Sequence, residues 1–133
     1  MSGTGGEAVI LGVDDDIDQL IVLQTHLDAA GYTFFGATGG EDALKLARRV
    51  SPRLIVLDLM MRGMDGFETC RRLRLEKAFA EVPILLLTSQ HTKPDVLKAR
   101  AVGASDFLVK PYDADQLLQR VRHWLSRPPA AGR

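Results

Sequence analysis

The spacing of hydrophobic and polar positions changes repeatedly between residues 8 and 126. Short, mostly apolar runs alternate with longer stretches in which apolar residues recur every three or four positions. The short runs are typical of β-strands, and the second pattern is typical of amphipathic helices. The alternation therefore predicts consecutive strand–helix units. The predicted strands are 8–13, 32–37, 54–58, 82–88 and 106–109, and the predicted helices are 17–30, 41–50, 67–76, 94–102 and 114–126.

Two of the predicted strands, 54–58 and 82–88, are apolar on both faces. Such strands are typical of parallel sheets that are covered by helices on both sides. Together with the strand–helix alternation, this predicts an α/β fold with a doubly wound, five-stranded parallel sheet and right-handed crossovers. Ligand sites in such folds lie outside the carboxyl ends of the strands.

The first predicted helix carries its own start and stop signals. Asp16 is predicted to be the N-cap, and Gly31 is predicted to be the residue just past the C-cap. Gly103 closes the helix at 94–102 in the same way. The helical spacing of the first helix is carried by Ile17, Leu20, Ile21, Gln24 and Leu27.

Length and composition fit one globular domain. The chain has 133 residues, of which 46% are hydrophobic and 26% charged, so disorder is excluded for most of the length. We expect a domain at 8–126 between flexible tails at 1–7 and 127–133, which are rich in Gly or in Pro, Ala and Gly. The apolar runs are far shorter than the ~18 residues of a membrane span, and residues 1–7 lack the pattern of a signal peptide.

Net charge and cysteine content limit the function classes and the cellular locations that we expect for the protein. Lys and Arg together number 17, as do Asp and Glu, so the formal net charge is zero. This argues against direct nucleic-acid binding through bulk charge. The single cysteine, Cys70, cannot form an internal disulfide, and we expect it to be a buried or half-buried helix residue in a cytoplasmic protein.

Chemistry-bearing residues follow the predicted strands at their carboxyl ends. Asp14 and Asp15 follow the first strand and Asp58 ends the third, while Thr88 with Ser89 and then Lys110 mark the ends of the fourth and fifth. The three acids bring a charge of −3 and Lys110 brings +1, so the carboxylates would repel one another unless a cation joined them. Hard oxygen ligands with no nearby His or Cys favour Mg²⁺.

A carboxylate beside Mg²⁺ can attack phosphorus and form an aspartyl phosphate. The Lys110 ammonium can neutralise charge on the transferring group, and the Thr88 hydroxyl can donate to a phosphoryl oxygen.

The ordered set of motifs resembles the receiver domain of two-component response regulators over residues 8–126. The resemblance implies a flavodoxin-like strand order of 2-1-3-4-5. The motifs are Val13-Asp14-Asp15, Leu57-Asp58-Leu59-Met60-Met61 with Gly63-Met64-Asp65-Gly66, Leu87-Thr88-Ser89 and Val109-Lys110-Pro111.

The resemblance also implies a role for each matching residue. Asp58 would be the phosphoacceptor, and Lys110-Pro111 would be a cis peptide. Asp14, Asp15, Asp58 and the backbone carbonyl of Met60 would hold the metal, and Thr88, Ser89, Lys110 and Phe107 would bind phosphate or act in the switch.

By the same resemblance, the protein would be a phosphorylation-activated switch of a phosphorelay. It would accept a phosphoryl group from a sensor histidine kinase or phosphotransfer protein, and it would catalyse only its own phosphorylation and slow dephosphorylation. The surface formed by residues 94–102, 106–109 and 114–126 would then change and contact an output partner or a second copy of the chain. No membrane would be bound. Candidate contacts on that face are Lys98, Arg100 and Arg120.

A degenerate receiver that acts only as a docking module stays open as the alternative. A test for phosphoryl mass after treatment with Mg²⁺ and a small phosphodonor separates the two. A phosphatase of the haloacid-dehalogenase type needs a second acid where this chain has Met60, which argues against that function.

Two further features lie outside the motifs. The receiver family usually has proline where this chain has Arg62, and the arginine places a cation near the site. Residues Arg71, Arg72 and Arg74 are predicted to form a solvated helix face.

Overall fold

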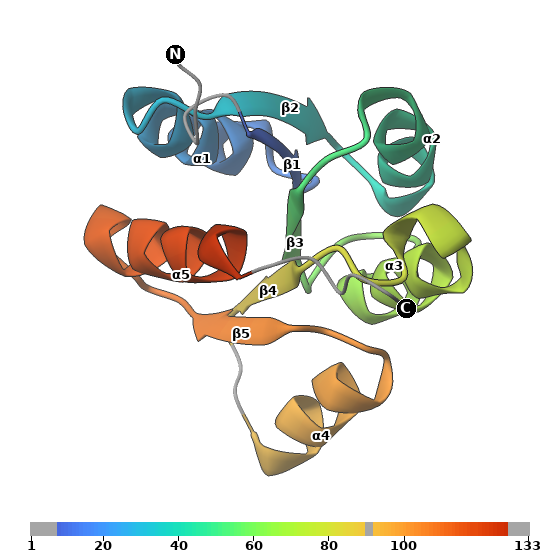
Figure 1. Cartoon of the computed structure of the whole chain (residues 1–133). Helices are drawn as coiled ribbons and strands as arrows, with labels where there is room; N and C mark the ends of the chain where they lie inside the picture. The colour runs from blue at the N-terminus through green and yellow to red at the C-terminus, as the bar shows by residue number, and fades with distance from the viewer. Residues whose placement is uncertain (1–7, 90–91, 128–133) are drawn as a thin grey trace.

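The computed structural model describes residues 8–89 and 92–127. The predicted tails lie outside these residues, apart from Arg127. Within the described residues, five strands alternate with five α-helices and one short 3₁₀ helix (Figure 1). The elements are β1 Val9–Val13, α1 Ile17–Ala29, β2 Thr33–Ala37, α2 Gly40–Val50, β3 Leu54–Asp58, α3 Gly66–Leu75, η2 Lys77–Phe79, β4 Ile84–Thr88, α4 Lys93–Ala101, β5 Asp106–Val109 and α5 Ala114–Ser126.

The five strands form one parallel sheet in the order β2-β1-β3-β4-β5, which confirms the predicted topology. Their register aligns the carboxyl ends of the central strands. Val13 pairs with Leu57, and Thr88 at the end of β4 pairs with Val109 at the end of β5. The residues that follow these positions therefore leave the sheet at one edge.

Helices cover both faces of the sheet, as predicted. In Figure 1, α1 and α5 lie on one side and α2, α3 and α4 on the other. Alternate residues of β3 divide between the two cores: Leu54 and Val56 pack with α1 and α5, while Ile55 and Leu57 pack with the other helices. This division explains why β3 has no polar position before Asp58.

Three elements, β3, β5 and α5, have the predicted bounds, and the others differ by one or two residues. The fourth strand begins at Ile84 rather than at residue 82, because the carbonyl of Val82 accepts a hydrogen bond from Arg74 instead of a neighbouring strand. In α1, the buried stripe is formed by Leu20, Leu23 and Leu27.

Ile17 and Ile21, which carried part of the helical spacing in the sequence, are 61% and 54% exposed. They lie beside the buried stripe of α1 at positions that the sheet does not reach. Asp16 is the N-cap of α1, and Gly31 and Gly103 follow the helix ends with positive φ, as predicted.

The prediction that Arg74 belongs to a solvated helix face is wrong. Its half-buried guanidinium donates to the carbonyl oxygens of Phe79 at 2.7 Å, Val82 at 2.6 Å and Gly103 at 2.9 Å. It also donates to the hydroxyl of Ser105 at 3.1 Å. Arg74 therefore joins the end of α3 to the segments that lead into β4 and β5.

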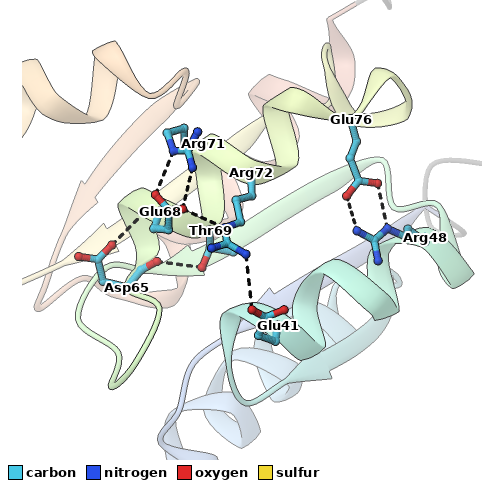
Figure 2. Close-up of polar contacts among 8 residues, drawn as sticks. All are labelled: Glu41, Arg48, Asp65, Glu68, Thr69, Arg71, Arg72 and Glu76. Carbon is cyan, nitrogen blue, oxygen red and sulfur yellow. Dashed lines mark hydrogen bonds and ion pairs between the residues drawn. The ribbon is translucent and has the colours of Figure 1, made fainter.

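Arg71 and Arg72 are exposed, as predicted, and both donate to the carboxylate of Glu68 (Figure 2). The two guanidinium groups lower the pKa of Glu68 to about 2. Arg48 of α2 pairs with Glu76 after α3 at 2.6 Å. Exposed ion pairs of this kind contribute only about 0–1 kcal/mol each, so the apolar core carries most of the α2–α3 packing.

Helix α3 begins in direct contact with the backbone that ends β3. A Cβ atom at Gly66 would lie 2.6 Å from the carbonyl oxygen of Asp58 and 2.7 Å from Cα of Leu59. The amide of Gly66 also donates to the carbonyl of Leu59 at 3.0 Å. A residue without a side chain is therefore required for α3 to approach this closely.

We predict that Gly66→Ser lowers the free energy of unfolding by about 1–3 kcal/mol, because backbone atoms must shift to admit the side chain. Gly39→Ser is the matched control, since a Cβ there meets no atom within 4 Å and serine is a good N-cap. Urea unfolding followed by circular dichroism measures both variants. Equal stability of the two variants would contradict this account of the α3 contact.

Candidate functional site

Acidic side chains from β1 and β3 meet at the carboxyl edge of the sheet. Asp14, Asp15 and Asp58 each offer a carboxylate oxygen, and these atoms all lie within 4.8 Å of one another. Lys110, which follows β5, places its Nζ 2.8 Å from Oδ1 of Asp58 and 4.0 Å from Oδ2 of Asp14. One small site thus contains residues that are far apart in the chain: Asp14 and Lys110 are separated by 96 positions.

The three consecutive aspartates have different local partners. Asp14 accepts a hydrogen bond from the amide of Asp16 at 2.9 Å, which fixes the turn after β1. Asp16 accepts from the amides of Asp18 and Gln19 and so caps α1. This capping role of Asp16 leaves Asp14 and Asp15 to face the site.

Burial controls the protonation of the two inner carboxyl groups. Asp14 and Asp58 are only 5% and 4% exposed. Burial, opposed by the hydrogen bond from Asp16, raises the pKa of Asp14 to about 6. Burial also raises the pKa of Asp58, against the hydrogen bond and charge of Lys110. Lys110 therefore favours the carboxylate form of Asp58, which is the form that can act as a nucleophile or metal ligand.

Asp15 lies further out and has a different partner, Arg62. The backbone amide of Arg62 donates to Oδ2 of Asp15 at 3.0 Å, and its Nε lies 3.4 Å from the same oxygen. These contacts lower the pKa of Asp15. The surface is hollowed beside them, and the depression is lined by Asp15, Asp16, Ile17, Asp18 and Arg62.

The donor set fits a hard divalent cation. Asp14, Asp15 and Asp58 could each supply an oxygen ligand, and among residues 8–89 and 92–127 they are the acidic cluster that is compact enough to hold a metal ion. Mg²⁺ prefers carboxylate oxygens and retains several waters, which suits a site that is open on one side. Met60, whose backbone carbonyl the resemblance adds as a ligand, follows Asp58 by two residues and is 58% exposed.

The remaining site residues lie on β4 and β5. Thr88 is buried at the last position of β4, and its carbonyl accepts from the amide of Lys110 at 2.7 Å. Ser89 is exposed directly after it. Phe107 is half-buried on β5, opposite Leu86 of β4. The structure therefore brings Asp14, Asp15, Asp58 and Lys110 into contact range, with Thr88 in the adjoining strand.

Sequence reasoning missed Tyr112. Burial, together with the charges of Asp14 and Asp58, raises the pKa of this tyrosine to about 12. Tyr112 follows the Lys110-Pro111 peptide, which is cis as the resemblance implies. Its place directly after Lys110-Pro111 is the signal that could have found it.

The sequence profile of the response regulator receiver domain matches residues 10–122. The chain belongs to this family. It is 39% identical over 118 residues to the DNA-binding dual master transcriptional regulator RpaA of Synechocystis sp., a match that covers 89% of this chain and 48% of RpaA. The intact site and the family together do not favour a degenerate docking module.

Two solved structures show the same fold. The chemotaxis protein CheY4 of Vibrio cholerae superposes with a TM-score of 0.86 and 32% identity, covering 88% of this chain and 98% of that one. The receiver domain of the sensor histidine kinase PA1611 of Pseudomonas aeruginosa gives a TM-score of 0.84 and 26% identity, covering 91% and 99%. The latter was crystallised with a magnesium ion in its active-site cleft.

The receiver chain spans about half the length of the curated relatives it matches. One of these relatives is named as DNA-binding, so the expectation of no nucleic-acid binding is not supported by the comparison. No helix among the described residues is long and apolar enough to cross a membrane.

We predict that Asp14→Asn stabilises the protein at high pH in the presence of EDTA. The pKa of Asp14 is about 6 in the folded protein against an ordinary value of 3.8, so the folded state binds more protons between these values. The free energy of unfolding of the wild type therefore falls as pH rises through this window. The variant avoids this loss and gains about 1–3 kcal/mol at pH 8, with no gain at pH 4.

Urea unfolding at pH 4, 6 and 8 measures this difference. Asp28→Asn, at an exposed position of α1, is the control and is expected to change the stability by less than about 0.5 kcal/mol. A stabilisation by Asp14→Asn that is independent of pH would contradict the burial argument.

Proposed function

We propose that residues 8–126 form a receiver that is switched by phosphorylation of Asp58 in a Mg²⁺-dependent reaction. The observation that carries the proposal is the position of Asp58: its carboxylate is nearly excluded from solvent, lies beside two further carboxylates and accepts a 2.8 Å hydrogen bond from Lys110. A solvated turn residue would need none of these features. The donor would be a sensor histidine kinase or a phosphotransfer protein.

The proposed transfer is a displacement at phosphorus. A carboxylate oxygen of Asp58 forms the new P–O bond while the P–N bond of the donor's phosphohistidine breaks. The electron pair of that bond stays on the imidazole nitrogen, which takes up a proton. The domain thereby catalyses its own phosphorylation. In the slow hydrolysis that follows, a water oxygen attacks the phosphorus, the P–O bond to Asp58 breaks, its electron pair returns to the carboxylate, and inorganic phosphate leaves.

Asp14, Asp15 and Asp58, with the backbone carbonyl of Met60, would hold the Mg²⁺. When bound, the ion neutralises charge on the transferring phosphoryl group. Lys110 adds a fixed positive charge from β5, and its ammonium is already within hydrogen-bond distance of Asp58. The side chain of Lys110 therefore needs little movement to reach a phosphoryl oxygen on Asp58.

Phosphorylation replaces one negative charge on Asp58 by close to −2 and adds acceptor oxygens. We infer that Thr88 and Ser89, at the end of β4, respond together with Lys110 to the added charge and oxygens on Asp58. A movement of Thr88 toward the phosphoryl group leaves space beside β5 into which Phe107 can turn. A few kcal/mol suffice to shift such a two-state population.

The surface formed by 94–102, 106–109 and 114–126 would carry the output, to a partner protein or a second copy of the chain. On this surface Arg100 and Lys98 are both exposed, and Nζ of Lys98 lies 4.6 Å from the centre of the Phe67 ring. Arg120 donates to Asp106 at 2.9 Å. Contacts of Lys98 and Arg120 with another protein would therefore compete with these interactions within the chain. The free, buried Cys70 is compatible with a cytoplasmic location.

We predict that Asp58→Asn forms no phosphoryl adduct with acetyl phosphate and Mg²⁺, because the amide lacks a nucleophilic carboxylate oxygen. Intact-mass spectrometry measures the adduct, and Asp28→Asn on exposed α1 is the matched control, which keeps it. An undiminished adduct on Asp58→Asn would refute the assignment of the phosphoacceptor. A wild-type protein that forms no adduct would favour the docking-module alternative.

Beryllofluoride, which mimics the phosphoryl group on an aspartate, tests the output surface. We predict that it shifts amide NMR resonances at the site and also across residues 94–126. Asp58→Asn is the control and should show neither set of shifts. Shifts confined to residues near Asp14, Asp58 and Thr88 would show that the 94–126 surface does not respond.

A further inference from the structure

Arg62 makes two contacts with one oxygen of a proposed metal ligand. Its backbone amide donates to Oδ2 of Asp15 at 3.0 Å, and its Nε approaches the same atom at 3.4 Å. The two contacts are separable, because the first belongs to the main chain and the second to the side chain. Only the second brings a positive charge to the carboxylate.

Arg62 differs from Lys110, the other cation at this edge of the sheet. The side chain of Lys110 is 26% exposed and bonds to the nearly buried Asp58. The side chain of Arg62 is 93% exposed, and its carboxylate partner is 24% exposed. Arg62 lines the depression beside Asp15 and can therefore leave Asp15 without disturbing the core.

We propose that Arg62 is a counter-cation that competes with Mg²⁺ for the carboxylate of Asp15 and so sets the Mg²⁺ concentration at which the site fills. This inference rests on the proposed metal site. It assigns Arg62 as a positioning residue, since the guanidinium would act through Asp15 rather than on the phosphoryl group.

Two physical effects support the competition. A carboxylate oxygen has two lone pairs, and the amide and Nε of Arg62 are both directed at Oδ2 of Asp15. A metal ion bound to the same carboxylate also meets the like charge of the guanidinium at short range. The backbone amide of Arg62 makes the largest contribution to the lowered pKa of Asp15, and the side-chain hydrogen bond and charge of Arg62 lower this pKa further.

Isothermal titration calorimetry with MgCl₂ tests the proposal at constant ionic strength. Arg62→Ala keeps the backbone amide and removes the guanidinium, and we expect it to bind Mg²⁺ about three- to fivefold more tightly than the wild type. Arg62→Lys keeps the charge and should bind Mg²⁺ more weakly than Arg62→Ala. Arg49→Ala removes an exposed cation from the last turn of α2 and controls for net charge, with an expected change below about twofold.

A second readout observes Arg62 directly. In ¹⁵N-resolved NMR, the Nε–Hε resonance of Arg62 should shift on addition of MgCl₂ with the same midpoint as the backbone amide of Asp15. A resonance that does not move while the Asp15 amide does would overturn the competition.

Affinity for Mg²⁺ that is unchanged or weaker in Arg62→Ala would also overturn it. Asp15→Asn separates this failure from failure of the proposed function: it should lose most Mg²⁺ binding whatever Arg62 does. If Asp15→Asn loses binding and the wild type forms the Asp58 adduct, the proposed function stands without the role of Arg62. If the wild type binds no Mg²⁺, both fail.

Discussion

Two carboxylates that are nearly excluded from solvent share one lysine at the edge of the sheet, and this unfavourable burial is the constraint on which the rest of the site depends. Burial of Asp14 and Asp58 raises the pKa of both groups, while the ammonium of Lys110 opposes the effect at Asp58. The folded chain tolerates this cost because the core beneath β3 and β4 is apolar on both faces of the sheet. The register of the strands then leaves little freedom in where the three side chains lie.

The same constraint explains the unequal roles of the cations around the site. Lys110 is anchored by the end of β5 and lies against the buried carboxylates, where its charge is weakly screened. Arg62 stands on an exposed loop against Asp15, the outermost acid, where solvent screens its charge and its side chain can move. The half-buried ammonium of Lys110 therefore favours the charged form of Asp58, whereas the exposed guanidinium of Arg62 can only modulate how readily Mg²⁺ enters the site.

The fold and the residues at the edge of the sheet could be predicted from the sequence because both depend on strong, local signals. Strand β3 is apolar throughout until Asp58, and the parallel topology brings every strand end to one edge. Contacts that depend on tertiary packing could not be predicted. Arg74 is half-buried because its guanidinium donates hydrogen bonds to carbonyl oxygens of η2 and of the segments before β4 and β5. Ile17 is exposed because only a narrow stripe of α1 contacts the sheet. Helical spacing identifies a helix, but it does not identify which apolar stripe the sheet will cover.

The hydrogen bonds around β5 limit how the proposed switch can move. The carboxylate of Asp106 accepts from Arg120 at 2.9 Å and from the indole Nε1 of Trp124 at 2.8 Å, which ties the start of β5 to α5. The amide of Phe107 donates to the same carboxylate at 2.8 Å, and the carbonyl of Phe107 accepts from Arg120 at 3.2 Å. The backbone at Phe107 is therefore held on both sides, while its half-buried ring is not. A rotation of the ring about its side-chain torsions costs fewer of these bonds than a displacement of the strand. The proposed signal would thus reach α4 and α5 through the shape of a side chain on a fixed strand, with Asp106 keeping β5 and α5 together in both forms.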